Sequence, residues 1–170
     1  MCKWRQRARW FFVAVCFLAG CGVYAQGRPG TDSLSISAAP GLVAFALPPN
    51  GVASGSSPVS ITTTWQFQRG GTQISVYAYF TNSAAALTDG TGSNIPSARV
   101  SGSVNGGPAA PFTGTGPYSA GGSLTVFTTL VRNNKKTTRV DDVNLQIDTT
   151  GLGLRAGSYS GVMRIQSFAL

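Results

Sequence analysis

The sequence predicts an all-β protein, a single antiparallel sandwich of about seven strands that follows a cleaved signal peptide. Gly 22 and Pro 9 among 170 residues, with abundant Ser and Thr, favour turns and short strands over helices. Several segments of four to ten residues alternate apolar and polar side chains between turn signals. Residues 154–170 form an alternating run without Pro, which predicts a closing strand that ties the C-terminus into a sheet.

Residues 1–25 have the layout of a secretory signal peptide. A basic stretch precedes the apolar run 10–19, and small residues follow it. The run is shorter than the roughly 20 apolar residues that a membrane-spanning helix needs. We therefore expect export, to the extracellular space or the cell surface.

Two ways of processing this segment remain open. Val23-Tyr24-Ala25 fits a cleavage site of the small-residue type, which would release the protein from Gln26 onward. Residues 18–21, Leu-Ala-Gly-Cys, resemble the bacterial lipobox, in which Cys21 would be lipidated and the protein held at the outer membrane as a lipoprotein. Only that second route predicts contact with a membrane.

The charge distribution argues against a nucleic-acid partner, and the positions of the cysteines argue against a disulfide in the folded domain. The net charge of +8 falls to +4 without the four basic residues of the signal peptide, because nine basic residues then face five Asp. The nine are scattered along the chain, so no nucleic-acid partner is expected. All three cysteines lie within the first 21 residues, and the remaining chain must therefore fold without a disulfide.

The folded domain is expected at 41–170, after a flexible N-terminal segment at 26–40. That segment is polar and contains Gly and Pro, although Leu34 and Ile36 alternate with serines and suggest an edge strand as the alternative. The apolar run 42–47 predicts the first secure strand, and the Asn50-Gly51 dipeptide predicts a turn after it.

Two alternating segments follow closely and predict an antiparallel hairpin. Residues 59–68 place Val, Ile, Thr, Trp and Phe on one face, and residues 73–80 place Ile74 and Phe80 on one face with Tyr77 and Tyr79 on the other. The Arg-Gly-Gly-Thr sequence between them favours a tight connection.

The second half of the chain contains the remaining predicted strands, at 97–104, 123–131, 143–149 and in the closing run. Residues 81–96 and 108–122 are expected to be loops, and residues 132–142 a charged hairpin tip. Seven short strands with turn signals at close spacing are typical of an immunoglobulin-like sandwich. A barrel or jelly roll is the alternative.

The side chains present argue against an enzyme. The chain has no His and no Glu, which excludes Ser-His-Asp and Cys-His nucleophiles and His-ligated metals. Asp141 and Asp142 are sequence neighbours and would point to opposite faces of a strand, so they cannot act as a carboxylate pair. We expect no catalytic residue, no metal site and no cofactor.

Tyr77 and Tyr79 are the candidate ligand-binding residues. They share a strand face and could present their rings as a stacking platform for a glycan or a partner, but cross-strand aromatic packing is the preferred explanation.

The closing strand also resembles a known family. Residues 156–161, Ala-Gly-Ser-Tyr-Ser-Gly, are similar to the AGxYxG C-terminal strand of secreted pilin-like and spore-coat-U-like immunoglobulin-type domains, and 76–80 and 94–96 resemble exported bacterial proteins of this kind. The resemblance implies a sandwich, surface exposure and assembly by strand exchange between subunits. The chain lacks the disulfide and the penultimate Tyr of chaperone-recognised pilins, which argues against chaperone–usher assembly.

From sequence, we therefore expect an exported bacterial surface or secreted protein with a structural or adhesive, pilin-like, non-enzymatic role. Its partners would be other surface subunits or further copies of itself, bound through sheet edges. The alternative is a small carbohydrate- or ligand-binding module that uses Tyr77 and Tyr79.

Overall fold

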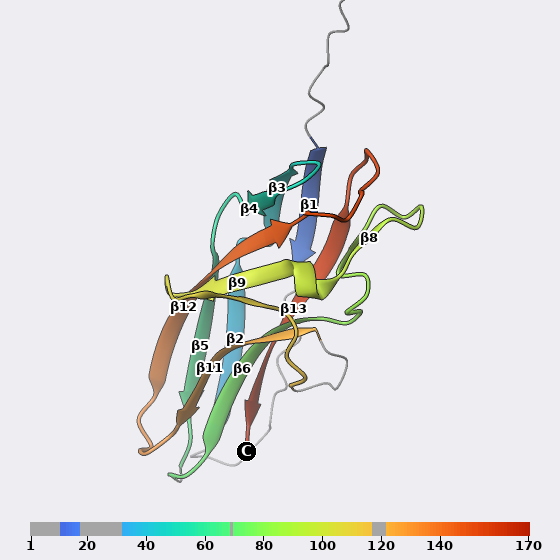
Figure 1. Ribbon diagram of the computed structural model, residues 1–170. Helices are drawn as coiled ribbons and strands as arrows, with labels where there is room; N and C mark the ends of the chain where they lie inside the picture. The colour runs from blue at the N-terminus through green and yellow to red at the C-terminus, as the bar shows by residue number, and fades with distance from the viewer. Residues whose placement is uncertain (1–10, 18–31, 69, 117–121) are drawn as a thin grey trace, which may run out of the picture.

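The computed structural model describes residues 11–17, 32–68, 70–116 and 122–170, and these residues form two facing β-sheets (Figure 1). Sheet A has the strand order β11-β6-β13-β1-β3, with β7 and β8 paired beside β13. Its strands are β1 (Phe11–Phe17), β3 (Leu42–Leu47), β6 (Gln73–Phe80), β7 (Leu87–Thr88), β8 (Asn94–Ile95), β11 (Ser123–Leu130) and β13 (Ser160–Ala169). The all-β prediction is confirmed.

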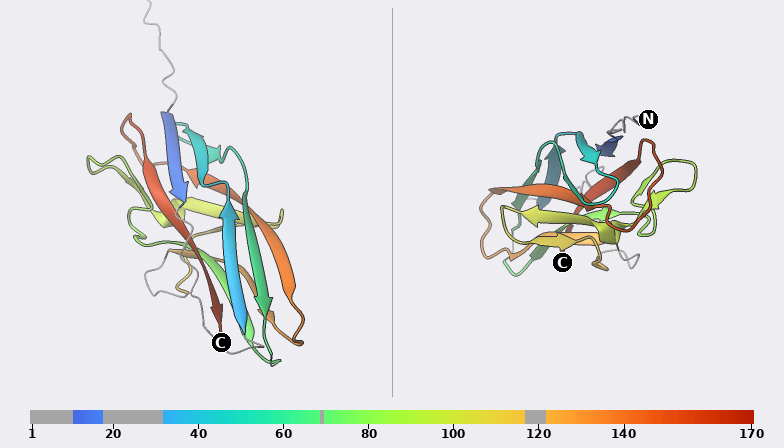
Figure 2. Two further views of the ribbon diagram at one scale, coloured as in Figure 1. Left: turned by 180° about the vertical axis from the view of Figure 1, so that it is seen from behind. Right: turned by 45° about the horizontal axis from the view of Figure 1, so that its top comes forward.

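Sheet B has the order β10-β9-β12-β5-β2, with β4 paired to β12. Its strands are β2 (Ser33–Ala39), β4 (Val52–Ser54), β5 (Val59–Gln66), β9 (Val100–Val104), β10 (Ala109–Pro111) and β12 (Thr137–Asp148). The named strand pairs of both sheets are antiparallel except β1 with β13, which is parallel. The arrangement is sandwich-like, with two layers and one apolar interior (Figure 2).

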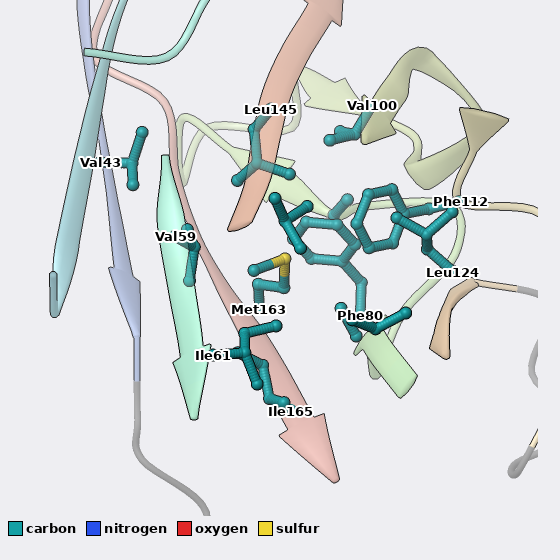
Figure 3. Packing of buried hydrophobic residues seen from close by; sticks show 14 of the residues in the cluster. Val43, Val59, Ile61, Phe80, Val100, Phe112, Leu124, Leu145, Met163 and Ile165 are labelled. Carbon is teal, nitrogen blue, oxygen red and sulfur yellow. The ribbon is translucent and has the colours of Figure 1, made fainter. Parts of the chain in front are cut away.

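The core lies between the two sheets because each strand turns its apolar face inward. In β5, Val59, Ile61 and Trp65 are buried while the intervening residues are half-exposed. In β13, Met163 and Ile165 are buried and meet Phe80 and Phe112 in the same cluster (Figure 3). The Phe80 and Phe112 rings pack edge to face with centroids 5.2 Å apart.

The predicted hairpin between 59–68 and 73–80 is wrong, although both strands exist. β5 pairs with β2 and β12 in sheet B, whereas β6 pairs with β11 and β13 in sheet A. The six residues between the two strands are long enough to cross the roughly 10 Å that separates packed sheets. The apolar faces of the two strands therefore meet across the core from opposite sheets.

The charged segment 132–142 is also not a simple hairpin tip. β12 begins at Thr137, so the exposed connection after β11 contains Lys135 and Lys136, whereas Arg139, Asp141 and Asp142 lie on the strand. Asp141 is fully buried and Asp142 is exposed. The opposite orientation expected for the two aspartates is confirmed, and the solvated position expected for Asp141 is wrong.

Smaller differences have local causes. Residues 97–99 form a 3₁₀ turn before β9, so that strand begins at Val100. A register shift between Thr125 and Phe127 of β11 marks a bulge, and Val126 and Phe127 are both buried as a result. Leu34 and Ile36 do form an edge strand, β2, which occupies the second half of the segment expected to be flexible.

The closing strand is inner, as its two-sided apolar pattern predicts. β13 lies between β6 and β1, and Tyr159, Met163 and Ile165 are buried, whereas Val162 and Phe168 are half-buried on the other face. Gly161 is required there, because a Cβ at this position would lie 1.9 Å from the carbonyl oxygen of Ala86.

Candidate functional site

An inner strand of sheet A comes from the segment expected to be a signal peptide. β1 pairs antiparallel with β3, with Val13 opposite Phe45, and parallel with β13, with Val15 opposite Gly161. Seen from behind, β1 (blue) lies between β13 (red) and β3 (cyan) (Figure 2, left). We call the position between β3 and β13 the β3/β13 slot.

The strand that lines one side of the β3/β13 slot is strongly patterned. Val43, Phe45 and Leu47 of β3 are buried, whereas Leu42 and Ala46 are exposed. Directly opposite residues of an antiparallel pair lie on the same face of the sheet. An occupant of the slot therefore needs apolar residues at alternate positions, and β1 has Val15, Val13 and Phe11 in register with these three.

The two candidate tyrosines lie on the outer face of sheet A. Tyr77 and Tyr79 are half-buried and share the outward face of β6, as expected. The Tyr79 hydroxyl donates to the Gln166 Oε1 at 3.3 Å, and Tyr77 meets Phe168 edge to face with centroids 6.3 Å apart. Sequence reasoning missed Gln166 and Phe168, because the pairing of β6 with β13 is not visible in the local pattern.

These contacts show how far the two tyrosine rings on the outer face of sheet A are available to a ligand. Gly116 also packs on the Tyr77 ring, since a Cβ there would lie 3.0 Å from the Tyr77 Cε1. The tyrosines are thus engaged with their neighbours rather than presented as two parallel free rings. Cross-strand packing accounts for both positions.

A charge cluster around the fully buried Asp141 lies on the inner face of sheet B, and the side chain of its partner Arg139 is 40% exposed. The Arg139 guanidinium donates to both carboxylate oxygens of Asp141, with Nε–Oδ2 at 2.8 Å and Nη2–Oδ1 at 2.7 Å. The Asn105 side chain adds a third donor at 2.7 Å, and the Arg139 Cζ lies 4.3 Å from the centroid of the Phe127 ring. Hydrogen bonding to Asp141 raises the pKa of Arg139 above its ordinary value. The hydroxyl of Thr63, opposite Arg139 in register, is buried without a partner among the described residues.

This cluster is built to stabilise the two-sheet packing rather than to react. The carboxylate is already satisfied by three donors, and the Arg139 plane covers an aromatic ring of the facing sheet. The remaining polar candidates are exposed turns: the Asp89 carboxylate accepts from the Thr91 hydroxyl at 2.7 Å, and this bond lowers the pKa of Asp89.

The other candidate features are small or lie outside the described part of the chain. A cavity of about 10 Å³ has room for one water, and it is lined by Leu47, Pro48, Pro49, Leu154, Arg155 and Tyr159. Among the described residues, no three His, Cys, Asp or Glu side chains group as metal ligands, and no helix is long and apolar enough to cross a membrane. Cys21 and the alternative cleavage site at Ala25 lie outside the described residues.

Comparison with known proteins adds no assignment. No family model and no curated protein sequence matches the chain.

Proposed function

We propose that the chain is an exported bacterial surface or secreted protein with a structural or adhesive, pilin-like role, and that it acts through the edges of an immunoglobulin-like sandwich. It is not an enzyme and uses no cofactor. Its partner is a further copy of itself or another surface subunit.

The observation that carries this proposal is that β1 lies within residues 1–25, the segment expected to be removed as a signal peptide. If residues 1–25 are removed on export, sheet A loses an inner strand, and β3 and β13 both face an empty position. Unpaired edges recruit a strand from another chain, because their N–H and C=O groups and the apolar row Val43, Phe45 and Leu47 become available together. A released domain with such a slot is suited to assembly.

The test is assembly of the processed protein. The chain is exported from a bacterial host, its N-terminus is identified by mass spectrometry, and its size is measured by light scattering after gel filtration. We expect concentration-dependent oligomers that Phe45→Asp prevents and that Val140→Asp, on an exposed position of β12, leaves intact. A processed wild-type protein that stays monomeric at all concentrations contradicts the proposal.

The second candidate function is glycan binding on the outer face of sheet A. It is favoured by the half-exposed aromatic row of Tyr77, Tyr79 and Phe168, with the Gln166 amide beside it. Binding on a glycan array that Tyr77→Ala and Tyr79→Ala remove, while the oligomeric state is unchanged, supports this function over assembly. An array without signal for the wild-type protein rejects it.

A further inference from the structure

The β3/β13 slot is already filled in the unprocessed chain, and the occupant is part of the chain itself. β1 is paired along six residues of β3 and four of β13, so it completes sheet A on both sides. We propose that the segment Phe11–Phe17 acts as an intramolecular plug that keeps the slot closed until the leader is removed. This inference rests on the proposed function for its consequence, because the plug then decides when the edges become available.

The plug has a defined register and direction in the slot, parallel to β13 and antiparallel to β3. The three β1 positions opposite the buried row of β3 are Phe, Val and Val, and Phe17 is in register with the fully buried Met163 of β13. The intervening positions 12 and 16 are opposite Ala46 and Leu42, which are exposed. The apolar run expected to direct export thus also places an apolar residue opposite each buried residue of β3.

The residues that follow the leader cannot replace the plug. Residues 26–32, Gln-Gly-Arg-Pro-Gly-Thr-Asp, contain no large apolar side chain, and Pro29 has no N–H for a ladder. The next segment, β2, alternates Leu34, Ile36 and Ala38, but it is paired with β5 in the other sheet. Removal of the leader therefore opens the slot instead of exchanging one covalent occupant for another.

The structure offers a direct test, because the plug carries a native cysteine. Cys16 is in register with Leu42 on β3 and with Val162 on β13. Neighbouring strands lie roughly 4.7–4.9 Å apart, which is within the Cα separation that a disulfide spans. Leu42 is about half-exposed, so its replacement leaves the core intact.

The experiment uses the full chain produced without export, with Cys2→Ser and Cys21→Ser so that Cys16 is the single native thiol. Leu42→Cys, Val162→Cys and the control Val140→Cys are oxidised under mild conditions and mapped by mass spectrometry. We expect an intramolecular bond to Cys16 in the first two variants, at least tenfold above the control, since Val140 is an exposed residue of sheet B. Equal yields in all three variants, or no bond in either test variant, overturn the proposal.

A second experiment follows the plug after cleavage. A specific protease site is inserted between Ala25 and Gln26 of the full chain, the folded protein is cut, and native mass spectrometry measures how long residues 1–25 remain bound. We expect the fragment to dissociate at least tenfold faster with Val13→Asp, whose position is opposite buried Phe45, than with the control Ala14→Ser, opposite half-buried Ala44. Immediate loss of the fragment from wild type and both variants contradicts the plug.

Different results would reject the intramolecular plug and the proposed assembly function. A retained fragment whose release leaves a folded monomer supports the plug and rejects assembly as the function. A cut chain that assembles equally well with the fragment bound and with it released rejects the plug and leaves assembly standing.

Discussion

Gly161 in the closing strand provides the sharpest test of how closely β13 and the start of β7 pack within sheet A. A Cβ at this position would lie 1.9 Å from the Ala86 carbonyl oxygen, 3.0 Å from the Ala86 carbonyl carbon and 3.2 Å from the Leu87 Cα. All three are backbone atoms, so no flexible side chain can move aside. Reaching ordinary van der Waals contact requires β13 and the start of β7 to separate by about 1.5 Å, which perturbs the Ser160–Thr88 pairing.

Gly161→Ala should therefore destabilise the fold strongly. Overpacking of this kind costs about 1–3 kcal/mol, and we expect the upper end because backbone must move. With a urea dependence of about 1–3 kcal/mol/M, a loss of about 3 kcal/mol lowers the unfolding midpoint by about 1–3 M. The measurement is urea unfolding followed by far-UV circular dichroism and tryptophan fluorescence.

Gly157→Ala is the matched control in the same motif. A Cβ at Gly157 meets nothing within 4 Å, and its φ lies outside the left-handed region, so the midpoint should be unchanged or rise slightly. Equal midpoints for Gly157→Ala and Gly161→Ala would show that the backbone of Ala86 and Leu87 does not lie this close to Gly161.

Three further predictions concern polar groups. Asp141→Ala should cost about 1–3 kcal/mol in thermal or urea unfolding, because it removes the charged acceptor of the Arg139 and Asn105 hydrogen bonds, whereas exposed Asp142→Ala should cost much less; similar losses for both would refute the role of the buried Asp141 carboxylate. Tyr159→Phe should cost about 1 kcal/mol, since the buried hydroxyl donates to the Ser93 Oγ at 2.7 Å, and an unchanged urea midpoint would argue against that bond. The pKa of Asp89 is lowered below its ordinary 3.8, so its contribution to the free energy of unfolding is complete above about pH 5 and is lost as the pH falls through the unfolded and then the folded pKa. Asp89→Asn should therefore flatten the acid side of the curve of unfolding free energy against pH, and a curve parallel to that of wild type would contradict this.

The buried aspartate illustrates why polar burial could not be predicted from the sequence. The alternation of 143–149 is a local signal and was found, but β12 extends six residues further toward its N-terminus through polar positions. Those positions are strand because they pair with β5, from Thr137 opposite Trp65 to Asp142 opposite Ser60. The buried carboxylate of Asp141 is satisfied there by Arg139 and by Asn105, which lies 36 residues earlier. The second partner is visible only after the chain has folded.

The sequence by itself determined the class of fold and the strands whose faces differ in polarity. Strands at 59–68 and 73–80 are predicted from a period of two, which a strand imposes on its own residues, and the strand at 42–47 is predicted from its short apolar run. The same local pattern also established that Tyr77 and Tyr79 share one face of their strand.

Only the tertiary structure decided which strand lies beside which. β5 and β6 follow one another in the chain but belong to opposite sheets, because their partners β2 and β12 on one side and β11 and β13 on the other come from distant parts of the sequence. Likewise, an apolar run such as Phe11–Phe17 is equally suited to a leader and to an inner strand, since both require only short, uncharged, apolar sequence. Its position between β3 and β13 is set by the gap that the remaining strands leave, and that gap exists only in the folded protein.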